Sequence, residues 1–118
     1  MAYFKENVQT TGDYFIHKYQ GVDLATFTKN IEETLNSNGY KLVEGRGTNA
    51  VYEKGNRTMR LLFGAFVKYY KFMVQMQEVN SAIDLRITKH SSGMSGGLIG
   101  VSQVKKELAR LGEIMKDV

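Results

Sequence analysis

The chain has 118 residues, which is enough for one domain with a single hydrophobic core. It contains no cysteine, which excludes disulfides, thiolate metal sites and a cysteine nucleophile, and its 42% hydrophobic and 24% charged residues are typical of a folded soluble protein. The net charge of +4 is modest and scattered, so it permits binding to an anion without requiring a nucleic acid.

The N-terminal sequence shows no targeting signal. It lacks the apolar run of a signal peptide, and no segment of the chain approaches about 18 consecutive apolar residues. We therefore expect a cytoplasmic protein that does not insert into a membrane. Residues 1–12 are polar without a clear period and are predicted to form a flexible arm, followed by a single domain over residues 13–118.

A strand and then a helix are the first regular elements predicted. The strand, Tyr14–Tyr19, is rich in aromatic and β-branched residues. Asp23 is a good N-cap for the helix because its carboxylate can accept the free amide hydrogens of the first turn. Val22 and Phe27 can pack together across this start as a hydrophobic staple, and Gly39 ends the helix. Apolar residues recur at helical spacing along it: Leu24, Phe27, Ile31 and Leu35.

Strands dominate the middle of the chain. The predicted ranges, separated by turn residues, are Tyr40–Glu44, Ala50–Lys54, Arg57–Phe63, Lys68–Glu78 and Ala82–His90. Side chains alternate in the last two ranges. This period of two predicts one buried set, Phe72, Val74, Ile83 and Leu85, and one set that is not buried, Lys71, Gln75, Asp84 and Arg86.

A glycine-rich stretch, Gly93–Gly100, precedes the final predicted helix, whose apolar stripe is Val104, Leu108, Leu111 and Met115. The stretch lacks the Lys-Ser or Lys-Thr pair of a P-loop, and Ser95 stands where G-x-G-x-x-G needs its first glycine. We interpret it as a structural joint that delivers Leu98 and Ile99 to the core. A weaker hypothesis is an anion site at the helix start, with Gly97, Gly100, Lys105 and Lys106.

The order strand, helix, four or five antiparallel strands, helix predicts an α+β fold. We expect a single antiparallel sheet of about five strands with two helices packed on one face. This order resembles one repeat of the TATA-box-binding protein (TBP-like) and a shortened helix-grip domain of the kind that holds apolar ligands. The resemblance lies in the order of the elements and implies the fold alone, because a shared fold does not transfer function.

No catalytic or metal-binding pattern is present in the sequence. His17 and His90 lie on separate predicted strands, while Glu32 and Glu33 are adjacent on a helix and so point in different directions. The patterns H-x-E, H-E-x-x-H and G-x-S-x-G are all absent. We therefore predict a protein that is not an enzyme and that has no cofactor and no metal site.

Two groups of residues carry hypotheses about binding. The first lies on the predicted outer face of the sheet: Arg60, Tyr69, Lys71, Met73, Gln75 and Arg86. The second would line an apolar cavity between sheet and helices: Phe27, Ile31, Phe72, Met76, Leu108 and Met115. We expect a small binding or assembly module that associates with itself or with another protein. The alternatives are a carrier of a small apolar ligand in that cavity and, less favoured, a weak nucleic-acid binder that uses the basic outer face.

Overall fold

The computed structural model describes residues 3–55, 62, 69–90 and 97–118, and within them the fold is α+β. The elements in chain order are β1 (Phe4–Thr10), β2 (Tyr14–Gln20), α1 (Leu24–Ser37), β3 (Lys41–Arg46), β4 (Asn49–Gly55), β5 (Tyr69–Val79), β6 (Ala82–Lys89), α3 (Gly97–Ile114) and a 3-10 helix, η2 (Met115–Asp117). The six strands form one antiparallel sheet in the order β1-β2-β6-β5-β4-β3. Neither α1 nor α3 has the length and apolarity needed to span a membrane.

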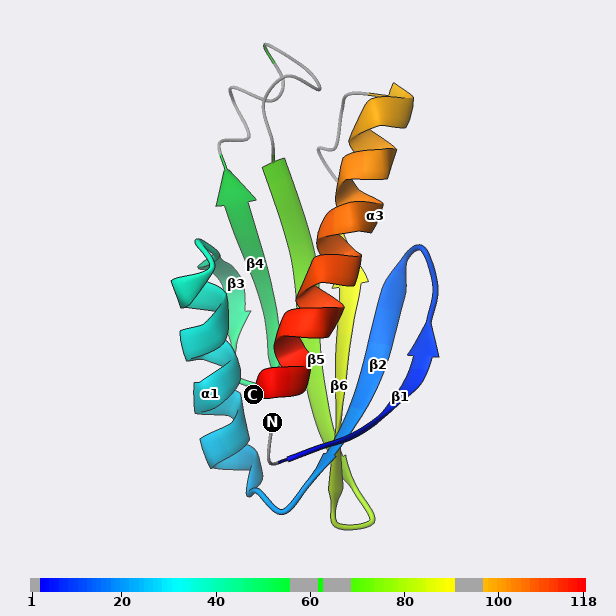
Figure 1. Cartoon of the computed structure of the whole chain (residues 1–118). Coiled ribbons are helices and arrows are strands. Elements are labelled where there is room, and N and C mark those ends of the chain that lie inside the picture. Colours follow the sequence, from blue (N-terminus) through cyan, green and yellow to red (C-terminus); the bar gives the residue numbers. More distant parts are fainter. Residues whose placement is uncertain (1–2, 56–61, 63–68, 91–96) are drawn as a thin grey trace.

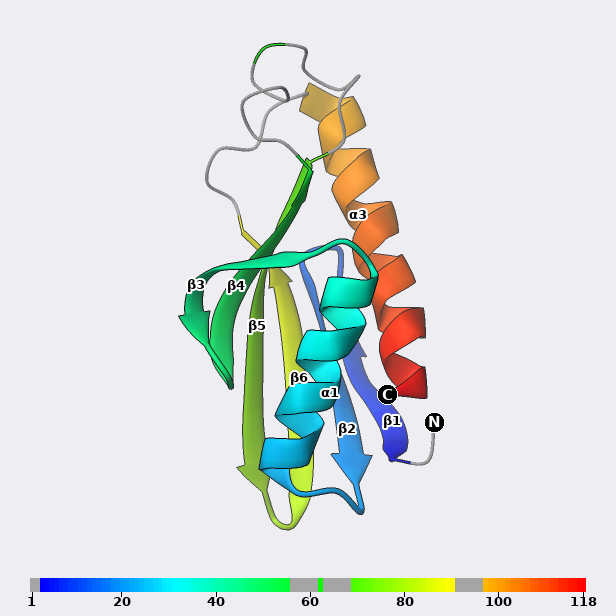
Figure 2. The same cartoon turned by 90° about the vertical axis from the view of Figure 1, so that its left-hand side faces the viewer.

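Both helices lie on the same face of the sheet, as the sequence predicted (Figures 1 and 2). The helix α3 packs over β2 and β6, and α1 lies nearer the β3 and β4 end of the sheet (Figure 1). One continuous cluster of buried side chains contains residues from both helices and from the inner faces of β2, β4, β5 and β6. The sheet therefore has an apolar inner face and an outer face that no described helix covers.

The predicted register of β5 and β6 is confirmed. The four apolar residues Phe72, Val74, Ile83 and Leu85 are buried, and the alternating set Lys71, Gln75, Asp84 and Arg86 is not. Asn80 and Ser81 connect the two strands with φ angles of 52° and 66°. Two successive residues with positive φ are what a two-residue type I′ turn requires, and this turn matches the twist of the flanking strands.

The predicted start of α1 is confirmed in atomic detail. Asp23 Oδ2 accepts a hydrogen bond from the Thr26 amide at 3.0 Å, and Val22 packs against the core at the same end. At the other end Gly39 has a φ of +87°, which a residue with a side chain rarely adopts. The buried positions of this helix are Phe27, Ile31 and Leu35.

The N-terminal segment corrects the prediction of a flexible arm over residues 1–12. Phe4–Thr10 form the edge strand β1, which pairs with β2 throughout its length. Register shifts between Phe4 and Glu6 and between Asn7 and Gln9 interrupt the pairing. Because each shift moves side chains to the other face, the strand shows no regular period of two in its sequence.

The glycine-rich stretch is also partly corrected. The helix α3 begins at Gly97, so Gly97, Leu98, Ile99 and Gly100 belong to its first turn instead of a joint. The apolar stripe predicted for this helix, Val104, Leu108, Leu111 and Met115, is buried. Residues 91–96 lie outside the described part of the chain. So does the predicted strand Arg57–Phe63, apart from Leu62, which is exposed and not in a strand.

We expect Asp23→Ala to lower the melting temperature by several degrees, because the Thr26 amide loses its acceptor at the helix start. Asp23→Asn should retain most of the stability, since an amide oxygen can accept the same hydrogen bond. Thermal unfolding followed by circular dichroism compares the two variants. An equal loss in both would mean that the charge of Asp23, and not its hydrogen bond, stabilises the helix start.

Candidate functional site

The edge strand β3 is the most exposed element of the sheet. All six of its residues are exposed, including two large apolar side chains, Leu42 at 44% and Val43 at 42%. Among the described residues the strand pairs only with β4, and a bulge between Leu42 and Glu44 leaves Val43 without a partner in β4. An edge strand presents unpaired backbone groups, so apolar side chains beside them are typical of a surface that pairs with another polypeptide.

The outer face of the sheet adjoins this edge and carries four of the predicted binding residues. Lys71, Met73 and Gln75 alternate along β5, and Arg86 of β6 lies directly opposite Gln75. The Arg86 guanidinium lies over the ring of Tyr14, 4.4 Å from its centroid. Arg60 falls outside the described residues.

Tyr69, the aromatic residue of this predicted set, is not available at the surface. Its side chain is buried, and its hydroxyl donates a hydrogen bond to Glu53 Oε2 at 2.7 Å. The period of two placed Tyr69 on the correct strand but could not show that the side chain is covered. The prediction of an exposed aromatic beside basic residues at this position is therefore wrong.

An open hollow of about 480 Å³ lies on the outer face between β2, β4, β5 and β6. A row of cross-strand neighbours, Ile16, Arg86, Gln75 and Asn49, forms much of its lining. Two side-chain oxygens of β6, Asp84 Oδ1 and Thr88 Oγ1, are buried without a hydrogen-bond partner in the described part of the chain. Such an oxygen costs about 1–3 kcal/mol unless a partner reaches it, and Asp84 lines the hollow itself.

The six residues predicted to line an apolar cavity are all part of the core. Each is buried in the one hydrophobic cluster that joins the sheet to the two helices. Of these six, only Leu108 lines the cavity described next, and only Met76 lines the outer hollow. The structure thus brings the six residues together as packing partners, and neither of the two hollows is lined by more than one of them.

A second cavity, of about 320 Å³, lies between the β1–β2 hairpin and α3, and its lining shares only Leu108 with the predicted apolar cavity. His17 and Gly112 line it together with Phe15, and all three are buried. Lys105 lies at its exposed side. The residues meet only through tertiary packing, since His17 and Gly112 are 95 positions apart in the chain.

Both ring nitrogens of His17 are engaged by the protein. Nε2 lies 2.8 Å from the Gly112 carbonyl oxygen, and Nδ1 lies 3.1 Å from the Asn7 side-chain nitrogen. A carbonyl can only accept and an amide nitrogen can only donate, so we assign the proton to Nε2 and a neutral ring. Burial holds the pKa of His17 below its ordinary value of 6.5, against a smaller opposing effect of the Gly112 hydrogen bond. Because the unfolded chain takes up this proton more readily, stability falls as the pH drops below that value.

The residues proposed for an anion site do not come together. Gly97 and Gly100 lie in the first turn of α3, whereas Lys105 is eight residues beyond Gly97, about 12 Å at about 1.5 Å per residue. Lys105 instead lines the second cavity, and Lys106 is exposed and lines neither hollow. His17 and His90 are likewise apart, because His17 pairs with Leu85 and His90 follows the far end of β6. No three metal-binding side chains gather within the described ranges.

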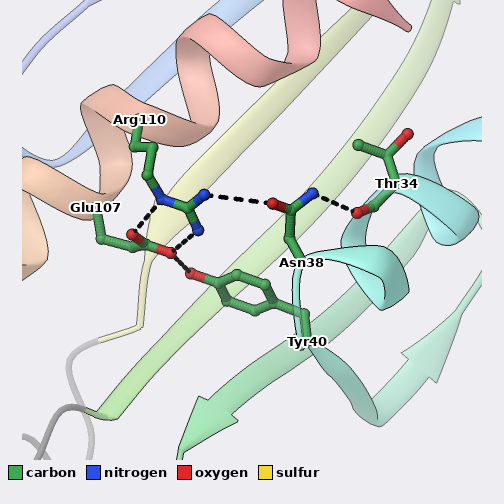
Figure 3. Close-up of polar contacts among 5 residues, drawn as sticks. All are labelled: Thr34, Asn38, Tyr40, Glu107 and Arg110. Atoms are coloured by element: carbon green, nitrogen blue, oxygen red, sulfur yellow. Dashed lines mark hydrogen bonds and ion pairs between the residues drawn. The ribbon is translucent and has the colours of Figure 1, made fainter.

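A buried carboxylate, Glu107 of α3, organises the junction between the two helices (Figure 3). Its oxygens accept two hydrogen bonds from Arg110, each 2.8 Å long, and one of 2.5 Å from the Tyr40 hydroxyl. Arg110 also donates to Asn38 Oδ1 at the end of α1, at 3.3 Å. Burial alone would raise the pKa of Glu107, but the hydrogen bonds from Arg110 and Tyr40 outweigh it and hold the pKa below its ordinary value of 4.5. The group is a satisfied structural anion, and its oxygens are occupied.

We expect Glu107→Gln to reduce the free energy of unfolding by about 2 kcal/mol at neutral pH, because Arg110 and Tyr40 lose a charged acceptor. The lowered pKa implies that this contribution is complete above pH 4.5 and is lost as the pH falls through the folded-state pKa. Urea denaturation at several pH values should therefore show the difference between wild type and variant shrinking in acid. Glu113→Gln is the matched control, since that exposed ion pair with Lys116 should leave stability unchanged.

Two glycines should respond in opposite ways to replacement by alanine. A Cβ at Gly112 would lie 3.7 Å and 3.8 Å from ring carbons of Phe15, which is ordinary contact, so Gly112→Ala should stabilise α3 by about 0.5–1 kcal/mol. Gly39→Ala should destabilise the protein, because Gly39 has a φ of +87° and a Cβ would approach Lys54 Cε to 3.3 Å. Chemical denaturation measures both changes. A loss of stability in Gly112→Ala would show that the packing against Phe15 tolerates no methyl group.

Comparison with protein-family models, curated protein sequences and solved structures finds no match to this chain. The function must therefore be inferred from the surfaces described above.

Proposed function

We propose that this protein is a non-enzymatic binding and assembly module that pairs with a second copy of itself through the edge strand β3. The observation that carries the proposal is the exposure of Leu42 and Val43 on a strand that, in the described part of the chain, pairs only with β4. Adding a strand to such an edge satisfies backbone groups and covers apolar side chains in one step. The lack of cysteine is in keeping with a cytoplasmic location, which we include in the proposal.

The charges on β3 favour a second copy as the partner. Lys41 and Glu44 are both exposed and lie on either side of the apolar pair. In antiparallel pairing centred on Leu42 and Val43, Lys41 of one copy comes near Glu44 of the other. A two-fold arrangement uses the same patch twice, so this attraction would occur twice in each dimer.

The other sheet edge lacks these properties. The strand β1 is interrupted by two register shifts, against one in β3, and such irregularities are a common way of blocking edge-to-edge pairing. It has one exposed large apolar residue, Val8.

The alternative functions have weaker support. The outer face carries acidic residues, Glu53 and Asp84, among its basic ones, Lys71 and Arg86, so it is not the continuous basic surface that nucleic-acid binding favours. The likeness to a TBP-like repeat or a helix-grip domain remains a likeness in element order. It adds a carrier of apolar ligands as an alternative, but the six residues of that hypothesis pack against one another in the core.

We expect the wild-type protein to form dimers in solution and Val43→Lys to shift it towards the monomer, because a charge would be buried at the new strand pair. Val8→Lys is the matched control, since Val8 is similarly exposed, at 49%, on the opposite edge of the sheet. Light scattering coupled to size-exclusion chromatography gives the mass at several concentrations. A wild-type monomer throughout, or a dimer that Val43→Lys leaves intact, would contradict pairing through β3.

A further inference from the structure

The cavity between the β1–β2 hairpin and α3 has an apolar floor and a polar mouth. Its buried lining includes Phe15, Leu108 and Gly112, while Thr10 and Lys105 are exposed at its opening. The volume of about 320 Å³ lies at the small end of the range of about 300–1,000 Å³ that is usual for ligand pockets. A ligand of this site would thus be small, with an apolar body and a polar head.

The charged residues around the mouth of the cavity determine whether the polar head of a ligand should be positive or negative. Lys116 is paired with Glu113 at 2.8 Å, so these two lining residues neutralise each other. Lys105 makes no ion pair or hydrogen bond within the described part of the chain, and the same holds for the Thr10 hydroxyl. The stem of Lys105 lies against Gly12, where a Cβ would be only 2.9 Å from Lys105 Cε. One positioned ammonium and one hydroxyl therefore remain to receive a single negative charge.

The glycine at position 112 is the second observation that indicates a ligand. A methyl group there would make ordinary contacts with Phe15 and with His17 Nε2, at 3.7 Å and 3.9 Å, and alanine is the better helix former. Sterics thus do not require a glycine in this turn of α3. What the missing methyl group does provide is space, because Gly112 lines the cavity. His17, fixed by hydrogen bonds at both nitrogens, forms a rigid wall beside that space.

We propose that this cavity binds a small carboxylate with an apolar body, held at its head by Lys105 and Thr10 and covered at its body by Phe15 and Leu108 above Gly112. A bare inorganic anion fits less well, since it would leave the apolar floor uncovered. The site is independent of the proposed dimer, because β1 and β3 are the opposite edges of the sheet (Figure 1).

The test is a titration of the full chain with benzoate and with hexanoate, followed by two-dimensional ¹H–¹⁵N NMR. We expect saturable binding of at least one of them with a Kd of about 1 mM or tighter, with shifts centred on the amides of Thr10, Phe15 and Gly112. Benzyl alcohol, which lacks the charge, and inorganic phosphate, which lacks the apolar body, should bind at least about tenfold more weakly. Failure of both carboxylates to saturate, or equal binding of phosphate, would overturn the proposal.

Two variants of α3 separate the proposed contact from a general effect of charge. Lys105→Ala should weaken carboxylate binding about tenfold or more, whereas Lys106→Ala should leave it unchanged, because Lys106 is exposed on the same helix and does not line the cavity. An equal effect of both substitutions would show that only the net charge matters and would exclude a contact at Lys105.

Gly112→Ala tests the space itself. This variant should remain folded, with an unchanged or higher melting temperature, and should bind either carboxylate about tenfold more weakly. Full affinity in a folded Gly112→Ala protein would place the ligand elsewhere. The Val43→Lys variant should bind carboxylates as the wild type does, so failure of the dimer and failure of this site can be distinguished.

Discussion

Burial of one apolar face of the sheet is the constraint on which the rest of the structure depends. Alternating residues of β2, β4, β5 and β6 point to the same side, and no single helix covers all of them. Two helices from distant parts of the chain cover this face together, so their positions relative to each other must be fixed. The carboxylate of Glu107, joined to Tyr40 and through Arg110 to Asn38, holds α3 against the end of α1 (Figure 3). A buried carboxylate without these hydrogen-bond donors would destabilise the fold, so the junction depends on this particular set of side chains.

Both candidate binding surfaces arise where this cover ends. No residue of the strand β3 is buried, and its apolar residues Leu42 and Val43 stay exposed. At the other edge α3 lies over β2 but leaves a cavity against the hairpin, and Gly112 is one of the residues that line it. The outer face has no helical cover in the described structure (Figure 2), and Lys71, Gln75 and Arg86 on it are not buried. The exposed apolar side chains, the cavity and the buried oxygens without partners thus lie at the two edges and on the outer face of the sheet.

The parts of the fold that could be predicted are those set by local chemistry. The cap at Asp23, the stop at Gly39 and the register of β5 and β6 depend on residues within a few positions of one another. The strand β1 could not be predicted, because two register shifts remove the period that identifies a strand. Gly97 was expected outside a helix because glycine is a poor helix former, yet helices in proteins depend more on packing than on propensity.

The candidate sites were predicted less well than the fold, for a related reason. A period of two gives the face on which Tyr69 lies but not the contacts that bury it. This cavity could not be predicted from the sequence, because the β1–β2 pairing and the packing of α3 bring together residues from opposite ends of the chain. Gly112 was the single available signal, a glycine within an otherwise regular helical pattern. Such a glycine indicates that something comes close or that space is needed, and only the structure distinguishes the two.

The helix α3 shows how the protein can tolerate that space. A glycine in a helix interior weakens the helix by about 1 kcal/mol relative to alanine. The helix, however, does not depend on its own propensity, since Val104, Leu108, Leu111 and Met115 are buried and Glu107 fixes it to Tyr40. The Tyr19 hydroxyl adds a buried hydrogen bond of 2.6 Å to the Met115 carbonyl beyond the glycine. Strong packing on both sides of Gly112 offsets its local cost, so one face of α3 can stabilise the fold while another leaves a cavity open beside His17.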